Sequence, residues 1–403
     1  MTAARNIHTI KTTGVLHLAF ELGEQDWKLA SSVGLGQKPR LKTIHARDLT
    51  KLQFEIAKAK RRFGLAADAP VKTCYEAGRD GFWLHRYLTA QGIDNRVVDS
   101  GSIEVNRRQR RAKTDRLDAG KLLNLLLRYH GGESKVWSIV RVPGLADEDA
   151  RQLHRDLEDL KDERTMHTNR IKGLLACQGL PAPGMPSPTV GKNFAQWLSA
   201  AKLWDGAPLP ADLQRRLLRE LERWQLLDRQ IRALELERRQ RIRRDDTPHV
   251  DKVRSLMDLW GIGLNGSWLL VHELFGWRRF SNRKQVGSCV GLTPTPYQSG
   301  NSRREQGISK AGNRRLRRLR RLLIELAWCW LRWQPDSELT HWYGRRLGAG
   351  NGRSRKLGVV ALARKLVIAL WKYLEQGEIP AGARLADWRK KVRGCGKTAL
   401  DAA

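Results

Sequence analysis

The sequence predicts an α/β domain followed by a mainly helical region, and three patterns along the chain support this division. In residues 1–145, short apolar or alternating runs interchange with amphipathic segments, which is typical of strands layered with helices. Residues 146–250 carry heptad-spaced apolar residues, and residues 251–376 carry helical patterns interrupted by glycine and proline. We expect residues 377–403 to form only a basic, mobile extension.

The N-terminal segment has the element order strand, strand, strand, helix, strand, helix, strand, helix. Alternating or continuous apolar runs mark the strands, and Asp48 is placed to cap the first helix. This order indicates a mixed sheet packed against helices. The predicted strands are Val15–Leu22, Trp27–Ser31, Leu41–His45, Val71–Tyr75 and Asn95–Asp99, and helices begin near Asp48, Gly81 and Asp115.

Two long segments of the middle region place apolar residues at intervals of three, four and seven residues. This spacing predicts two helices that form an antiparallel coiled coil, separated by a loop with prolines from Pro181 to Pro188. The helices can pack within one domain or serve as a dimerisation arm, and the spacing allows both. The apolar positions are Leu153, Leu157, Leu160, His167, Ile171 and Leu174 in the first helix, and Leu213, Leu217, Leu221, Trp224, Leu227, Ile231 and Leu234 in the second.

The chain is strongly basic. Its 75 Lys and Arg against 42 Asp and Glu give a net charge of +33, which indicates a polyanionic partner bound largely through phosphate contacts. A membrane-surface protein is the competing class, but no apolar run approaches the roughly 18 residues of a membrane span. The scattered cysteines form no CxxC pair, and the first residues lack a secretory apolar segment, so we expect a cytoplasmic location.

Four acidic residues are candidates for a metal site. Glu21 lies in the first predicted strand, Glu76 follows the strand at 71–75, and Asp115 and Asp118 open the helix after the last strand. Carboxylates at strand ends and at a helix N-terminus can meet at one edge of an α/β sheet and bind Mg²⁺. Each also has an ordinary explanation, because helix N-termini favour acids and strand residues can face solvent. The residue pattern alone leaves both explanations open.

The C-terminal region contains a basic helix beyond a stretch rich in proline and glycine. Its leucine stripe predicts a packed face, and its arginines predict a surface that lies along a phosphate backbone. A glycine turn at 261–263 between two helices offers a further place for a phosphate. Ser299 is either a turn residue or a hydroxyl presented on an exposed loop beside bound phosphate. The candidate nucleic-acid contacts are Arg303, Arg304, Lys310, Arg314, Arg315, Arg317 and Arg318.

Three stretches resemble the DEDD transposases of the "IS one-ten" insertion-sequence family, which includes the Piv invertase and the bridge-RNA-guided recombinases. They are Tyr75-Glu76-Ala77-Gly78, Lys113 to Ala119, and Gly291 to Asn313. The resemblance implies a RuvC-like domain of RNase H fold, a coiled-coil helical arm and a mainly helical C-terminal transposase domain. Glu21 aligns with the first acid of the family pattern, which is usually Asp.

From the resemblance, the four acids are expected to hold Mg²⁺ or Mn²⁺, and Ser299 is expected to attack DNA and form a phosphoserine link. Ser302 is the second candidate for this role. The resemblance also implies double-stranded donor and target DNA, a non-coding guide RNA, and a dimer or tetramer. In such an assembly the metal centre and the serine would meet in a composite site.

Two other functions are compatible with the residue pattern. A metal-dependent, structure-selective nuclease would hydrolyse DNA with water, and Ser299 would then be only a turn residue. A non-catalytic nucleic-acid-binding scaffold would use the acids structurally. The nuclease predicts cleavage without a covalent adduct, whereas the scaffold predicts no cleavage.

Overall fold

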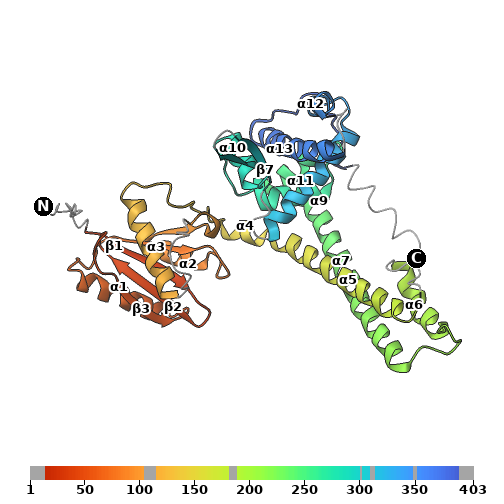
Figure 1. Cartoon of the computed structure of the whole chain (residues 1–403), viewed down its shortest axis with the longest axis horizontal. Coiled ribbons are helices and arrows are strands. Elements are labelled where there is room, and N and C mark those ends of the chain that lie inside the picture. The colour runs from red at the N-terminus through yellow and green to blue at the C-terminus, as the bar shows by residue number, and fades with distance from the viewer. Residues whose placement is uncertain are drawn as a thin grey trace. The chain divides into compact units, whose positions relative to one another are not determined.

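The computed structural model describes residues 14–103, 115–180, 188–299, 302–308, 314–347 and 352–389. The chain divides into two compact units, Met1–Val142 and Pro143–Ala403. The first unit combines helices with a mixed sheet and the second is mainly helical, which agrees with the fold class predicted from the sequence (Figure 1). Within the described ranges, no helix has the length and apolar character needed to cross a membrane.

The first unit follows the predicted order of strands and helices. Asp48 caps the first helix, because its Oδ1 accepts a hydrogen bond from the Lys51 backbone N–H at 2.8 Å. The elements are β1 (Leu16–Leu22), β2 (Asp26–Ser32), β3 (Arg40–His45), α1 (Leu49–Arg62), β4 (Val71–Glu76), α2 (Trp83–Ala90), β5 (Asp94–Val98), the 3-10 turn η1 (Ser100–Ser102) and α3 (Asp115–His130).

The strands of this unit form a mixed sheet with the order β3-β2-β1-β4-β5 among its described residues. β1 pairs antiparallel with β2, and β2 antiparallel with β3. β4 lies parallel to β1, and β5 lies parallel to β4. Short turns join the antiparallel strands, whereas α2 provides the crossover between β4 and β5. β1 is therefore the central strand, and β2 and β4 lie on its two sides.

The two faces of the sheet pack against different helices. Phe20 of β1 is buried with Leu52 of α1 and Leu84 of α2. On the opposite face, Ala19 and Cys74 are buried with apolar side chains of α3. Because side chains alternate along a strand, odd-numbered residues of β1 and even-numbered residues of β4 lie on the α3 face.

The second unit contains a helical arm and a helical body. The body is built around an apolar core in which Trp268 and Trp330 are almost fully buried. The elements are α4 (Leu145–Asp149), α5 (Gln152–Ala176), α6 (Pro188–Ala200), α7 (Ala211–Arg244), α8 (Pro248–Met257), α9 (Leu264–Leu270), the π-helix η2 (Val271–Phe275), α10 (Arg283–Cys289), β6 (Pro294–Ser299), β7 (Ser302–Ile308), α11 (Arg314–Trp333), α12 (Glu338–Leu347) and α13 (Gly352–Gln376).

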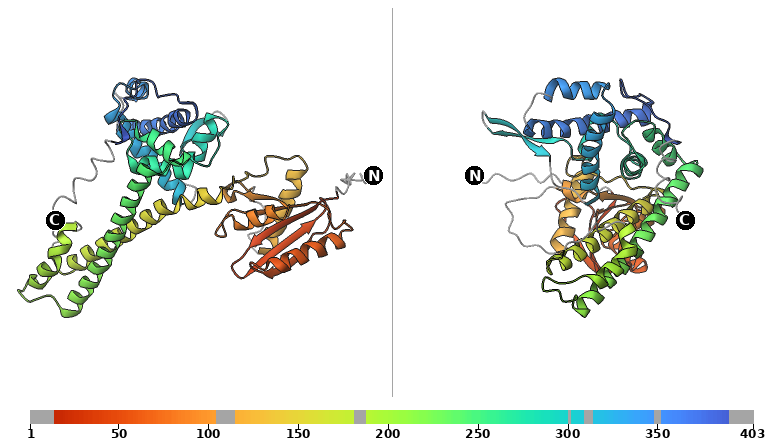
Figure 2. Two further views of the ribbon diagram at one scale, coloured as in Figure 1. Left: turned by 180° about the vertical axis from the view of Figure 1, so that it is seen from behind. Right: turned by 90° about the vertical axis from the view of Figure 1, so that its right-hand side faces the viewer.

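The arm consists of α5 and α7, which lie side by side in Figures 1 and 2. Lys161 Nζ lies 2.7 Å from a Glu235 carboxylate oxygen, and His167 Nδ1 lies 2.6 Å from Glu220. Later residues of α5 thus meet earlier residues of α7, so the helices run antiparallel. The predicted pairing is confirmed as a contact between two helices of the same chain, while its use between subunits stays a prediction.

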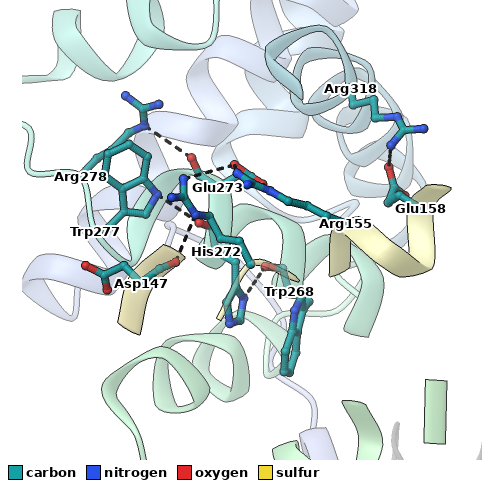
Figure 3. Close-up of polar contacts among 10 residues, drawn as sticks. Asp147, Arg155, Glu158, Trp268, His272, Glu273, Trp277, Arg278 and Arg318 are labelled. Atoms are coloured by element: carbon teal, nitrogen blue, oxygen red, sulfur yellow. Dashed lines mark hydrogen bonds and ion pairs between the residues drawn. The ribbon is translucent and has the colours of Figure 1, made fainter. Parts of the chain in front are cut away.

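The arm joins the body at the π-helix η2 (Figure 3). Arg155 of α5 donates two hydrogen bonds to the Glu273 carboxylate, at 2.8 and 3.2 Å. The Arg278 guanidinium lies 4.2 Å from the centre of a Trp277 ring, and Trp277 Nε1 donates to the His272 carbonyl at 3.1 Å. Charge-assisted contacts therefore fix the start of α5 on the body.

Two histidines are buried at this junction. His272 stacks on Trp268 with ring centres 4.4 Å apart, and burial is the main cause that lowers the pKa of His272 to about 4. Burial, with a further contribution from nearby Arg238, lowers the pKa of His154 to about 3. Both rings are therefore neutral near pH 7, since burial disfavours the charged form.

Residues 377–389 pack against the turn between α8 and α9, in place of the mobile extension that we expected. Leu385 forms an isolated bridge with Leu259, and the Trp388 backbone N–H donates to Asp258 Oδ1 at 3.0 Å. The Gln334 side chain adds a hydrogen bond to the Arg384 carbonyl at 3.0 Å. This stretch is thus part of the folded body.

Candidate active site

Two of the predicted acids lie on the central strands of the sheet. Phe20 of β1 pairs in parallel with Tyr75 of β4, so the next residues, Glu21 and Glu76, continue on neighbouring strands. Neighbouring strands are about 4.8 Å apart, and alternation assigns both acids to the α3 face. Glu21 is partly buried and Glu76 is exposed at the carboxyl end of β4. The sheet therefore brings these two residues together.

The direction of α3 brings its N-terminus to the same end of the sheet. Near the C-terminus of α3, His130 Nδ1 lies 3.3 Å from Lys72 Nζ at the start of β4. Further back along the helix, the Leu122 carbonyl accepts a hydrogen bond from Cys74 Sγ at 3.8 Å. α3 thus runs antiparallel to β4, and one more helical turn, about 5.4 Å, leads to Asp118 near the carboxyl end of that strand.

The structure describes the side chain of Asp118 but not that of Asp115. Asp118 Oδ1 accepts a hydrogen bond from Lys121 Nζ at 3.0 Å, and its side chain is partly buried. Asp115 is the first residue of α3, and its side chain lies outside the described residues. Glu21, Glu76 and Asp118 therefore come to one end of the sheet, and Asp115 begins the helix that leads there.

Carboxylate oxygens are the ligands that Mg²⁺ and Mn²⁺ prefer, so the donor set fits such an ion. Among the side chains that the structure describes, no group of three or more His, Cys, Asp or Glu residues is close enough to hold a metal. Lys121 lies on Asp118, and Lys28 of β2 lies opposite Glu21. The role of the four acids as metal ligands stays a prediction.

The two candidate serines are opposite each other in a β-hairpin. β6 ends at Ser299, β7 begins at Ser302, and the strand register pairs these two residues. Figure 2 shows the hairpin projecting from the helical body. The expectation of a loop around Ser299 was therefore wrong, because residues 294–299 and 302–308 are strands. The side chains of both serines lie outside the described residues, so placement does not rank them.

The sequence contains a signal for this hairpin. Gly300 and Asn301 separate Pro294–Ser299 from Ser302–Ile308, and a Gly-Asn dipeptide between two extended runs is typical of a two-residue hairpin loop. The prolines at 294 and 296 and the charged residues that follow obscured the strands, because their alternation is not hydrophobic.

The predicted basic contacts have different roles within the chain. Arg317 is exposed on α11. Arg318 instead forms ion pairs with two carboxylates of α5, at 2.8 Å with Glu158 and also with Asp162, and thereby binds the arm (Figure 3). The remaining candidates, of which side chains or whole residues lie outside the described part, are Arg303, Arg304, Lys310, Arg314 and Arg315.

Known proteins resemble this chain over most of its length. Residues 253–341, which run from α8 into α12, match the model of the transposase IS116/IS110/IS902 family. A putative transposase, y4rJ, of Sinorhizobium fredii (strain NBRC 101917 / NGR234) is 39% identical over 381 residues, which cover 92% of this chain and 94% of the relative. This chain belongs to the IS116/IS110/IS902 transposase family. A transposase for insertion sequence element IS1328 from Yersinia enterocolitica is 27% identical over 229 residues, 56% of this chain and 63% of the relative.

Membership of this family makes the chain a DNA transposase, and it confirms the family that the sequence motifs indicated. The matched segment contains the glycine turn, the hairpin with Ser299 and Ser302, and α11. The acidic end of the sheet lies outside this segment but inside a chain whose likeness to the Sinorhizobium relative covers 92% of its residues. DNA is therefore the substrate on which the two candidate sites, the acidic end of the sheet and the hairpin serines, would act.

Proposed function

We propose that this transposase cuts and rejoins DNA through a phosphoserine intermediate formed at Ser299. Glu21, Glu76, Asp115 and Asp118 would hold Mg²⁺ or Mn²⁺, which would lower the negative charge of the scissile phosphate and orient it. The observation that supports this most is the adjacency of Glu21 and Glu76 at the end of the sheet to which α3 leads.

The strand order of the first unit supports a RuvC-like RNase H fold. In the order β3-β2-β1-β4-β5, antiparallel strands on one side are followed by parallel strands on the other, and α3 packs on the face that carries the acids. Ligands of α/β sheets bind at the carboxyl ends of the strands. The acids of β1 and β4 lie at such ends, which fits a catalytic edge.

The proposed chemistry conserves phosphodiester bonds. Ser299 Oγ attacks the phosphorus and loses its proton as the Oγ–P bond forms, while the P–O bond to the departing nucleotide breaks and its oxygen takes up a proton. A nucleotide hydroxyl from another strand then attacks the same phosphorus, which releases the serine and joins the strands. Because each bond broken is replaced by a bond of the same kind, strand exchange needs no external energy source.

A guide RNA and an oligomer complete the proposal. The net charge of +33 is large enough for the binding of two polyanions. The proposed partners are double-stranded DNA and a non-coding RNA, in the cytoplasm. The exposed Arg317 of α11, together with Arg303, Arg304, Lys310, Arg314 and Arg315, would contact their phosphates. A dimer or tetramer, assembled through the arm, would bring the serine and the acids to one phosphate.

A denaturing gel tests this function. The protein is incubated with the RNA of its element, a labelled element-junction DNA and Mg²⁺, and the labelled products are separated by size. We expect a protein-linked DNA band in the wild type, no such band in Ser299→Ala or Asp115→Ala, and an undiminished band in Ser302→Ala. Ser281→Ala serves as a control, because Ser281 precedes α10, outside both strands of the hairpin, and has no proposed role.

Three outcomes would contradict the proposal in different ways. Cleaved DNA without an adduct, equally strong in Ser299→Ala, indicates a nuclease that uses water. Loss of the adduct in Ser302→Ala but not in Ser299→Ala assigns the nucleophile to the opposite strand of the hairpin. Binding of DNA without cleavage under any metal condition indicates a scaffold.

A further inference from the structure

Two half-exposed tryptophans lie together beside the glycine turn of the body. Trp260 and Trp333 are 42% and 44% exposed, and their ring centres are 6.0 Å apart with an interplanar angle of 36°. The Arg332 guanidinium lies 5.3 Å from the Trp333 ring centre, which is a cation–π distance. Large aromatic faces that remain accessible in pairs are typical of binding surfaces, since indole rings are otherwise mostly buried.

The pair is held rigidly by its surroundings. Trp260 Nε1 donates to the Leu385 carbonyl at 3.0 Å, and the Trp260 carbonyl accepts from Gln334 Nε2 at 2.9 Å. Gly261 has φ +82°, and a Cβ at this position would lie 3.2 Å from the Trp333 Cβ, so the turn and α11 are in close contact. Stacking of a partner on these rings would cost little side-chain conformational entropy of the protein, because the indoles are already held in place.

A basic and aromatic stripe runs along α11 and meets this pair at Arg332, whose guanidinium lies on the Trp333 ring. Arg317, Arg321, Trp328 and Arg332 are exposed and follow each other at helical spacing, so they share one face. Arg317 to Arg332 spans about 22 Å at 1.5 Å per residue. No ion pair between these arginines and a carboxylate occurs among the side chains that the structure describes. Glu325 also lies on this face, between Arg321 and Trp328.

We propose that this aromatic stripe, made of Trp260, Trp333, Arg332, Trp328 and Arg321, binds an unpaired stretch of DNA during strand exchange. Free guanidinium groups along α11 would follow the phosphates, and the fixed indoles would stack on the bases. Duplex DNA offers its phosphates but keeps its base faces stacked inside, so the exposed indoles match an opened strand better than a closed one. The inference rests on the proposed function, because DNA strands separate from their partners during strand exchange.

Equilibrium binding of short oligonucleotides to the full chain tests this inference. In EDTA, so that no strand is cut, labelled dT12 and a 12-base-pair duplex are titrated by fluorescence anisotropy. We expect Trp260→Ala and Trp333→Ala each to weaken dT12 binding by about 5- to 150-fold, the range for loss of one base stack. Binding of the duplex should change by no more than about twofold, since phosphate contacts remain.

Control variants separate stacking from folding. Trp333→Phe keeps an aromatic face and should restore dT12 binding to within about threefold of the wild type. Trp204→Ala removes a tryptophan that is 92% exposed in the arm, and it should leave binding unchanged. Glu325→Gln removes the carboxylate from the stripe and should tighten binding by up to about fivefold. A 2-aminopurine base in the oligonucleotide should lose emission on binding to the wild type but not to Trp333→Ala.

The outcomes distinguish this inference from the proposed function. If the protein binds dT12 and duplex DNA but Trp260→Ala and Trp333→Ala bind both like the wild type, the aromatic stripe is not a DNA surface and the proposed function is untouched. Equal losses for dT12 and duplex, in variants that melt like the wild type, would contradict a preference for unpaired DNA. Tighter binding of the matching RNA oligonucleotide would overturn the assignment to DNA. A chain that binds no nucleic acid contradicts the proposed function as well.

Discussion

The acids of the first unit and the serines of the second unit are held by different kinds of structure. Glu21 and Glu76 belong to β1 and β4, each of which pairs with a strand on both sides. Ser299 and Ser302 end β6 and begin β7, which within the described residues pair only with each other. A central strand can shift only if hydrogen bonds on both sides break, whereas the end of a hairpin is held by fewer bonds. Metal ligands need fixed positions, while a nucleophile has to reach a phosphate that is already bound.

Removal of one of the two strand carboxylates, Glu21 or Glu76, should have the largest effect on activity. Glu76→Gln and Glu21→Gln keep the size of each side chain. We expect DNA cleavage to fall by about 1,000-fold or more, because the proposed metal would supply several kcal/mol of transition-state stabilisation. The melting temperature of Glu76→Gln should stay within about 2 °C of the wild type, since Glu76 is exposed at a strand end.

The control for Glu21→Gln is Glu24, a carboxylate that follows the same strand, β1, and has no proposed role. Glu24 is 79% exposed in the turn after β1 and forms an ion pair with Arg79 at 3.1 Å. Glu24→Gln should cut DNA like the wild type. Equal losses of activity in Glu24→Gln and Glu21→Gln would mean that charge in general, rather than a metal site, explains the effect.

A second prediction compares how much the arm and the hairpin contribute to the stability of the second unit. Trp224 is 3% exposed in the arm, and its Nε1 donates to Thr168 Oγ1 at 3.1 Å. Trp224→Ala should lower the free energy of unfolding by about 3–5 kcal/mol, because it leaves a large cavity. It also removes one of the two hydrogen bonds of Thr168 Oγ1, which still donates to the Arg164 carbonyl. Ser299→Ala in the hairpin should leave stability unchanged within about 0.5 kcal/mol. Chemical denaturation measures both.

Leu226 provides the matched position in the arm. It is 47% exposed on the same helix as Trp224, so Leu226→Ala should cost less than about 1 kcal/mol. A hairpin variant as unstable as Trp224→Ala would contradict the view that the hairpin contributes chemistry rather than stability.

Acid pH should weaken the second unit through its buried histidines. Burial lowers the pKa of His272 to about 4 and of His154 to about 3, whereas both are near 6.5 in the unfolded chain. The unfolded state therefore takes up protons first as pH falls below 6.5, and stability present above that pH is lost progressively toward pH 4. At pH 5.5 the loss should be about 1 kcal/mol for each histidine.

Thermal unfolding between pH 7.5 and 5.0 measures this loss. His154→Gln cannot take up the proton, so its melting temperature should fall less steeply with pH than that of the wild type. His45→Gln is the control, because His45 is 89% exposed in the other unit. Parallel slopes for the wild type and His154→Gln would show that His154 is not a source of the pH dependence.

An effect of similar size is expected at the glycine turn. Gly261→Ala places a Cβ 3.2 Å from the Trp333 Cβ and 3.3 Å from the Cys329 carbonyl, at a φ of +82° that side chains disfavour. We expect a loss of about 1–2 kcal/mol in the free energy of unfolding. Gly344→Ala in α12 meets no atom within 4 Å, so it should be neutral or stabilising by up to about 1 kcal/mol.

Local sequence patterns predicted many of the strands and helices. The strand order and the ion pairs of Arg318 could not be predicted, because they depend on contacts between residues distant in sequence. The strands at 15–22 and 71–75 and the cap at Asp48 could be predicted, because each depends on neighbouring residues. The order β3-β2-β1-β4-β5, which makes Glu21 and Glu76 neighbours, depends on pairing between distant segments. In the same way, the ion pairs of Arg318 with α5 depend on how the arm packs, which no pattern in α11 indicates.

Mass-spectrometric mapping of the protein–DNA link would show directly whether Ser299 becomes joined to DNA. After the reaction with Mg²⁺ and junction DNA, nuclease and trypsin leave a nucleotide remnant on the peptide Gln285–Arg303, which contains Ser288, Ser299 and Ser302. Fragmentation of that peptide should locate the remnant on Ser299 in the wild type, and no modified peptide should form in Glu76→Gln. A remnant on Ser302 or on another residue, or DNA cleavage without any modified peptide, would contradict the account.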